Sequence, residues 1–158
     1  DPHSPQGDRR IVSFYEQLTG PEQTVTLDVS QCPDLVPPLA ALAAGLEGKT
    51  IHIVGAARLR IKESDRLATT SQVLNELGAQ VEELSEGLTI RGVAQFAGGV
   101  TVPCHNDHRI AMMAAMAATR CEAPITLTGA QCVAKSFPDF WEVYEKLGGT
   151  IVKSEEIL

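Results

Sequence analysis

The 158-residue sequence predicts an α/β protein made of two related units in which helices pack inside sheets. Along the sequence, short runs with the alternating pattern of strands are followed by longer runs with helical periodicity, and this order recurs. Landmark residues recur at nearly fixed distances, since Asp34 and Asp107 are 73 positions apart and Gly55 and Gly129 are 74 apart. The run 110–118 is apolar almost throughout, and only a helix covered on all sides tolerates such a run.

The first unit is expected to span residues 24–95, after a leading segment of residues 1–23. Its expected elements are strands at 24–29 and 50–54, helices at 34–44 and 64–77, and a hairpin of 80–84 with 88–91. Gly78 directly follows the second helix and is typical of a helix C-cap. The order of these elements is strand, helix, strand, helix and hairpin.

The second unit is expected to span residues 100–153 and to repeat this order. Its expected elements are strands at 100–102, 125–128 and 150–153, and helices at 107–119 and 137–147. Ser136 is the expected cap of the last helix, whose apolar and aromatic stripe is expected in the core: Phe137, Phe140, Trp141, Tyr144 and Leu147. Repeat units bury little core alone, so two units suggest a missing third unit or a partner.

Composition limits the possible functions. Hydrophobic residues make up 44% and charged residues 21%, as in ordinary globular proteins, and the net charge of −7 disfavours nucleic acid or an anionic membrane as partner. No apolar run has the length of a membrane span. The four cysteines lack metal-binding spacing, so we expect reduced thiols in a cytoplasmic protein.

The segment Lys62-Glu63-Ser64-Asp65-Arg66 is the first candidate for chemistry. On an ideal helix, Lys62, Glu63 and Arg66 would share the side of the apolar stripe, whereas a solvated charge run faces away from it. Two interpretations follow. One is a charged first turn with pairing between successive turns of the helix. The other is an anion site in which a carboxylate held among cations moves a proton.

Two further segments place cations at helix starts. Asn106-Asp107-His108-Arg109 opens an otherwise apolar helix, where an arginine is costly unless an anion meets it. Lys135 directly precedes the last helix, at the position that Lys62 holds in the first unit. Taken alone, His108 is typical of a structural histidine and Lys135 of a solvent-exposed lysine. A repeat architecture would bring these helix starts to one end, where the cations could clamp a phosphate and a carboxylate.

These segments, with Cys32-Pro33-Asp34, resemble the ordered motifs of the EPSP synthase (3-phosphoshikimate 1-carboxyvinyltransferase) family. The similarity runs from about residue 24 to residue 149, over much of a C-terminal domain. The resemblance implies inverse α/β barrel-like repeats of the enolpyruvyl transferase fold, in about two βαβαββ units. It also implies transfer of the enolpyruvyl group of phosphoenolpyruvate to the 5-hydroxyl of shikimate 3-phosphate, without a metal or cofactor.

The resemblance assigns roles to individual residues. Asp34 is implied as the base at the shikimate hydroxyl, Glu63 as the acid and base at the methylene carbon, and Lys62 as a contact to both substrates. The residues implied for binding phosphoenolpyruvate are Arg66, His108, Arg109 and Lys135.

Family members have two similar domains with the substrates between them, so this chain is expected to be a fragment that lacks the N-terminal domain and is inactive alone. Two alternatives remain. One is the related UDP-N-acetylglucosamine enolpyruvyl transferase, which the Lys-Glu-Ser-Asp-Arg segment disfavours. The other is a non-catalytic module, derived from the enzyme, that binds anions or docks a partner.

Overall fold

The structure is a computed structural model, and it describes residues 3–153. With η denoting a 3-10 helix, the elements are η1 (Gly7–Arg10), α1 (Ile11–Thr19), β1 (Thr24–Asp28), η2 (Pro33–Leu35), α2 (Val36–Ala44), β2 (Thr50–Val54), η3 (Ala57–Ile61), α3 (Arg66–Leu77), β3 (Gln80–Leu84), β4 (Gly87–Arg91), β5 (Phe96–Gly98), β6 (Thr101–Pro103), α4 (His108–Ala118), β7 (Cys121–Ala123), β8 (Thr126–Thr128), η4 (Ala130–Lys135) and α5 (Phe140–Lys146). Within residues 3–153, no helix is long and apolar enough to cross a membrane.

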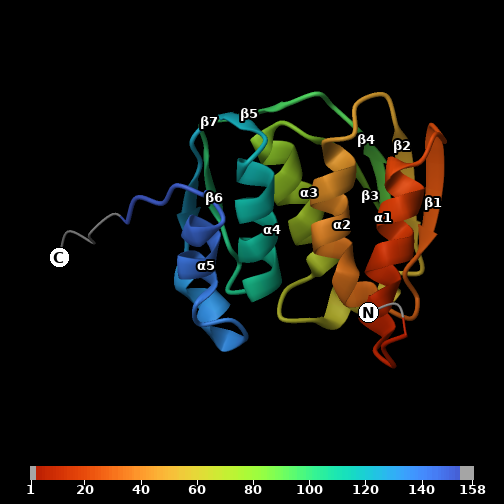
Figure 1. The fold of residues 1–158 in the computed structure, drawn as a ribbon, viewed down its shortest axis with the longest axis horizontal. Helices are drawn as coiled ribbons and strands as arrows, with labels where there is room; N and C mark the ends of the chain where they lie inside the picture. Colours follow the sequence, from red (N-terminus) through yellow and green to blue (C-terminus); the bar gives the residue numbers. More distant parts are fainter. Residues whose placement is uncertain (1–2, 154–158) are drawn as a thin grey trace.

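A four-stranded sheet in the order β1-β2-β4-β3 forms one side of the molecule (Figure 1). β1 and β2 are parallel, and β4 runs antiparallel to both β2 and β3. In β1 the buried residues Val25 and Leu27 alternate with exposed ones, as expected for a strand with one face on the core. The expected strands and hairpin of the first unit are therefore confirmed.

Helices α2, α3 and α4 contact one another and form an inner layer (Figure 1). α3 contacts β3 and β4 of the large sheet and also β5 and β6, so strands lie on more than one side of this layer. Most of α4 is buried, including Ile110, Ala114 and Ala117, while Met116 is exposed. The expectation of an enclosed apolar helix is thus confirmed for all but the outer edge of α4.

The second half of the chain repeats the first only in part. β6 and β8 form a parallel pair, and the chain between them contains α4. In the same way β1 and β2 form a parallel pair, and the chain between them contains α2. The expected strand at 150–153 is wrong, because these residues form no strand. In the first half β3 is held by its hairpin partner β4, whereas within residues 3–153 no strand follows α5.

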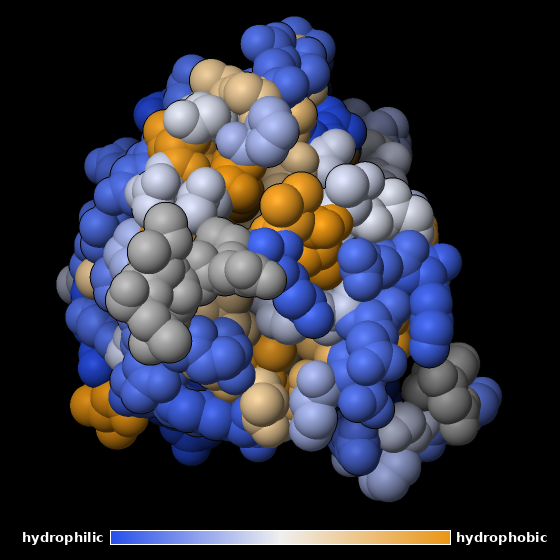
Figure 2. Space-filling view, turned by 90° about the vertical axis from the view of Figure 1, so that its left-hand side faces the viewer, coloured by the Kyte–Doolittle hydropathy of each residue, from blue (hydrophilic) through white to orange (hydrophobic). Residues whose placement is uncertain are grey.

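The last helix also differs from the expectation. It begins at Phe140 rather than at residue 137, and Ser136 ends the preceding η4 instead of capping α5. The aromatic stripe is not core: no residue of α5 is buried, and Phe137 and Leu147 are exposed. The reason is that α5 has neighbours on one side only, through Trp141 to η4 and Tyr144 to α4. Figure 2 shows apolar patches among hydrophilic atoms on this side of the molecule.

Besides 3-10 helices, three elements had no counterpart among the expected ones, namely α1, β5 and β7. α1 packs against β1 and α2 through the buried Phe14 and Leu18. β5 and β7 form a second short parallel pair beside α3. Of the four three-residue strands, β6 and β8 were expected at 100–102 and 125–128, whereas the short runs of β5 and β7 gave no recognisable pattern.

Candidate functional site

Two aspartates set the helix starts from which the site is built. Asp65 accepts a hydrogen bond from the N–H of Ala68 (3.2 Å) and caps α3. Asp107 accepts one from the N–H of Arg109 (3.0 Å) and caps α4. Because α3 begins at Arg66, Lys62 and Glu63 lie in the connection before the helix, and their expected place on the helix face is wrong.

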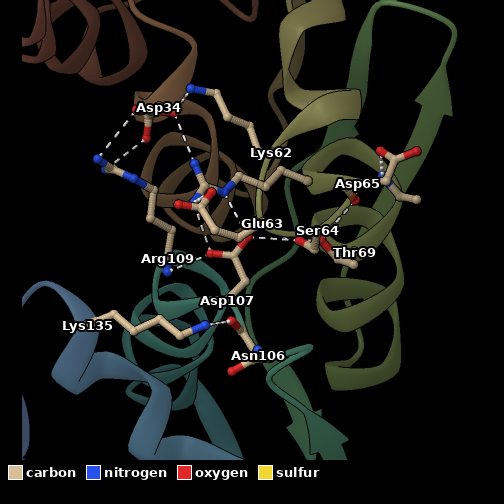
Figure 3. A network of polar contacts seen from close by, with 12 residues as sticks. Asp34, Lys62, Glu63, Ser64, Asp65, Thr69, Asn106, Asp107, Arg109 and Lys135 are labelled. Atoms are coloured by element: carbon tan, nitrogen blue, oxygen red, sulfur yellow. Dashed lines mark hydrogen bonds and ion pairs between the residues drawn. The ribbon is translucent and has the colours of Figure 1, made fainter.

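Asp34 is surrounded by three cations (Figure 3). Its carboxylate oxygens lie 3.3 Å from Nζ of Lys62, 3.0 Å from Nη1 of Arg66 and 3.5 Å from Nη2 of Arg109. Arg109 also donates to the backbone carbonyl of Asp34 (3.4 Å). These residues come from the starts of α2, α3 and α4, so the expected convergence of the helix starts is present in the structure.

Arg66 lies underneath this cluster and links it to the second half of the chain. Its guanidinium is almost fully buried and donates from Nε to Oδ2 of Asp107 (2.8 Å) and from Nη2 to Oδ1 (3.1 Å). It also donates to Glu63 (2.6 Å), so three carboxylates surround one arginine when Asp34 is included. Arg66 thus orients Asp34 and Glu63, and its position beneath them makes it a support for the site as well as a candidate ligand.

Asp107 carries a buried charge that its neighbours stabilise. Burial alone would raise the pKa of its carboxyl group, but hydrogen bonds from Arg66 and Ser64, the charge of Arg66 and the N–H of Arg109 together lower the pKa below its usual value. The Ser64 hydroxyl donates to Oδ2 at 2.8 Å. Asp107 is therefore a carboxylate at neutral pH and the permanent counter-ion of Arg66.

The remaining two predicted residues lie beside this cluster without joining its ion pairs. Nζ of Lys135 donates to the backbone carbonyl of Asn106 (2.6 Å), which places the third motif next to the second (Figure 3). His108 opens α4, and its Nδ1 is buried without a hydrogen-bond partner among the described residues. Asn106 itself has the unusual backbone angle φ of 53°, which a side chain tolerates only in a tight turn.

The arrangement favours doubly charged anions as ligands. Lys62, Arg109 and Lys135 present cationic groups that are partly or largely exposed, while Glu63 and Asp34 provide accessible carboxylates among them. Such a site can bind phosphate and carboxylate groups and can move protons. Among residues 3–153, no three histidine, cysteine, aspartate or glutamate side chains group into a possible metal site.

A sizeable groove of the described molecule lies elsewhere. An open groove of about 850 Å³ lies at the C-terminal ends of α2, α4 and α5. Its lining includes Leu42, Met116, Arg120, Ile125, Tyr144 and Leu147, and none of the clustered carboxylates. We place the candidate site at the charged helix starts, because proton transfer and anion binding need the groups gathered there.

The sequence reasoning missed two partners in this site. Asp107 and Ser64 stand within the candidate segments, but Asp107 was not identified as the carboxylate that meets Arg66, and Ser64 was given no role of its own. The signal for Asp107 was available, because a cation on the apolar side of a helix requires a carboxylate or an anion. Ser64 carried no such signal, since a lone serine before a helix is common.

Comparisons with known proteins place the chain in a family. The family model described as EPSP synthase (3-phosphoshikimate 1-carboxyvinyltransferase) matches residues 6–144. The chain belongs to the EPSP synthase family. Within this family, the 3-phosphoshikimate 1-carboxyvinyltransferase of Clostridium acetobutylicum is 46% identical over 158 residues, which cover 92% of this chain and 36% of the relative.

Other members give the same result. The Clostridium perfringens protein of the same name is 49% identical over 152 residues, covering 94% of this chain and 35% of the relative. This chain therefore spans a little over a third of the length of these relatives.

A solved EPSP synthase from Acinetobacter baumannii superimposes with a TM-score of 0.67 at 36% identity, over 80% of this chain and 29% of that chain. The predicted enolpyruvyl transferase fold is thereby confirmed.

Proposed function

We propose that this chain supplies one wall of the active site of a 3-phosphoshikimate 1-carboxyvinyltransferase. The observation that carries the proposal is the meeting of Asp34, Lys62, Glu63 and Arg109 around the buried Arg66. The family and the names of its members supply the reaction: the enolpyruvyl group of phosphoenolpyruvate passes to the 5-hydroxyl of shikimate 3-phosphate, and phosphate is released.

Both proposed substrates are anions, and the exposed cations of the cluster suit them. Phosphoenolpyruvate would bind through its phosphate and carboxylate to Arg109 and Lys135, with Arg66 behind them and His108 alongside. Lys62 lies on the other side of Asp34 from Arg109 (Figure 3) and would contact both substrates. Arginine is suited to such groups because its planar fork donates two parallel hydrogen bonds.

The two accessible carboxylates would divide the proton transfers. Glu63, as the acid, gives its proton to the methylene carbon of phosphoenolpyruvate while the shikimate hydroxyl oxygen bonds to the adjacent carbon. Asp34 takes the proton of that hydroxyl. Glu63, now a carboxylate, then removes a proton from the new methyl group as the bond to phosphate breaks, which restores the double bond. General acid and base catalysis of this kind contributes about 10²–10⁴-fold to a rate.

The rest of the site would come from the part of the enzyme to which this chain does not correspond, above all an N-terminal domain that closes over the substrates. A cytoplasmic location belongs to the proposal and is supported by four cysteines that are all free thiols. The family model supports this reaction over that of the UDP-N-acetylglucosamine enzyme.

The proposal is tested in a chimaeric enzyme. In this enzyme, the chain replaces the matching segment of the Clostridium acetobutylicum protein. We expect it to release phosphate only when phosphoenolpyruvate and shikimate 3-phosphate are both present. An Arg109→Ala variant should require a higher phosphoenolpyruvate concentration, whereas Arg91→Ala, which removes an exposed arginine of β4, should not. A folded chimaera that binds both substrates without turnover would support the non-catalytic module instead.

A further inference from the structure

Arg60 forms a dense set of contacts just outside the candidate site. Its Nη1 donates to Oδ1 and Oδ2 of Asp65 at 3.2 and 3.0 Å and also to Glu83. Its Nη2 donates to the carbonyl of Leu84 at 2.7 Å, and both Nη2 and Nε lie 3.3 Å from the carbonyl of Ser85. One guanidinium thus joins the start of α3 to the turn of the β3–β4 hairpin.

These contacts enclose the segment that carries two proposed functional groups. Arg60 and Asp65 flank residues 61–64, so their ion pair closes a short loop that contains Lys62 and Glu63. Residues 62–65 belong to no helix or strand, and Ile61 is almost fully exposed. The loop therefore receives its shape from side-chain contacts and not from regular backbone pairing.

Asp65 has two functions in this arrangement. The carboxylate that accepts from Arg60 also accepts from the N–H of Ala68 and caps α3. The far side of the loop is fastened separately, through the hydrogen bond of Ser64 to Asp107. With both sides fastened, Lys62 and Glu63 point at Asp34 and Arg66.

We propose that Arg60 is a positioning residue for the carboxyvinyl transfer, because its clamp on Asp65 and the hairpin turn holds the 61–64 loop with Lys62 and Glu63 directed into the site. This inference rests on the proposed function for its catalytic consequence but not for its structural one. Arg60 itself makes no contact with Asp34, Glu63 or Arg109 among the described hydrogen bonds and ion pairs, so it acts through the loop. The guanidinium is needed because Arg60 donates from three separate nitrogens, Nε, Nη1 and Nη2, whereas the single nitrogen of a lysine cannot reach all of these acceptors.

The structural half of the inference is tested on the chain by hydrogen–deuterium exchange. We expect Arg60→Ala to speed exchange of the Ala68 and Thr69 amides by about tenfold, because both donate to Asp65 and local opening sets the exchange rate of hydrogen-bonded amides. Arg60→Lys should show the same increase in exchange rate, and it provides the test if the alanine variant does not fold. Arg91→Ala is the matched control, because it removes an exposed arginine from the other end of β4 and should leave the loop unchanged. Exchange of the Ala68 and Thr69 amides that stays at the wild-type rate in a folded Arg60 variant overturns the proposal.

The catalytic half is tested in the chimaeric enzyme. A displaced Glu63 should lower kcat by about 10²-fold in Arg60→Ala and Arg60→Lys, as misplacement of a reacting group by about 1 Å does. The KM for phosphoenolpyruvate should change much less, because Arg109 and Lys135 lie on other elements. A rise in KM as large as the fall in kcat contradicts positioning, and so does an unchanged kcat. An inactive parent chimaera would refute the proposed function. The exchange experiment would then decide by itself whether Arg60 holds the 61–64 loop.

Discussion

Replacing Asp107 by asparagine should destabilise the protein strongly, although the substitution alters only a few atoms. The Asp107 side chain is fully buried, and its Oδ2 accepts from both Arg66 and Ser64 at 2.8 Å. In asparagine an NH2 group would replace that oxygen, and this hydrogen-bond donor would face the two donors of Arg66 and Ser64. Arg66 would then be a buried cation with one carboxylate fewer.

The size of the effect follows from these contacts. Removing one partner of a buried ion pair costs about 3–5 kcal/mol. Arg66 keeps Asp34 and Glu63, and the remaining asparagine oxygen can still cap α4, so we expect the lower end, about 3 kcal/mol. With a urea m-value of about 2 kcal/mol per molar, the unfolding midpoint would fall by about 1.5 M.

Urea unfolding followed by circular dichroism at pH 7 measures this change. Glu76→Gln is the matched control, because it makes the same change of charge on the exposed side of α3 and should stay within about 0.5 kcal/mol of wild type. If Asp107→Asn also stayed within that margin, the buried pair of Arg66 and Asp107 would not stabilise the fold as reasoned.

Four further results are expected. Since the folded-state pKa of Asp107 is lowered, its stabilisation is present above about pH 4 and is lost as the pH falls through the lowered value, so acid unfolding of Asp107→Asn should be less steep than that of wild type. Burial raises the pKa of Cys104 to about 12, so iodoacetamide at pH 8 should label this thiol only after unfolding, and rapid labelling of the native chain would contradict its burial. Asp34→Asn should tighten phosphate binding to the chain by about tenfold, measured by calorimetry, because Asp34 no longer competes for Lys62 and Arg109; equal or weaker binding would count against this competition. The purified chain alone should show no carboxyvinyl transfer in a phosphate-release assay, because positioning both substrates supplies about 7–11 kcal/mol and one wall cannot provide it; turnover like that of its relatives would contradict this.

The first half of the fold could be predicted because its patterns are long and regular. Alternation marked β1 and β2, and the capped, periodic run before Gly78 marked α3. In the second half, the three-residue strands β6 and β8 lie close to the expected strands, whereas β5 and β7 were not expected. The aromatic stripe of α5 was misplaced in the core, since periodicity shows that a helix has an apolar side but not whether another element covers it.

For the site, the motifs identified which residues gather but not how they pair. Asp34, Lys62 and Arg109 lie together as the repeat suggested. The burial of Arg66 and the clamp by Arg60 depend on contacts between segments far apart in the chain, such as the 41 positions that separate Arg66 from Asp107. Such pairings follow from the packed geometry and have no local sequence pattern.

The most direct test of the proposed reaction follows the proton at the methylene carbon. The chimaeric enzyme would be run in deuterated water with both substrates, and deuterium in the methylene group of the product would be measured by NMR together with the rate. The account predicts deuterium incorporation by the parent chimaera and a rate lower by about 10²–10⁴-fold in Glu63→Gln, with phosphoenolpyruvate still bound. Near-normal turnover and deuterium incorporation in Glu63→Gln would contradict the central claim that this carboxylate moves the proton.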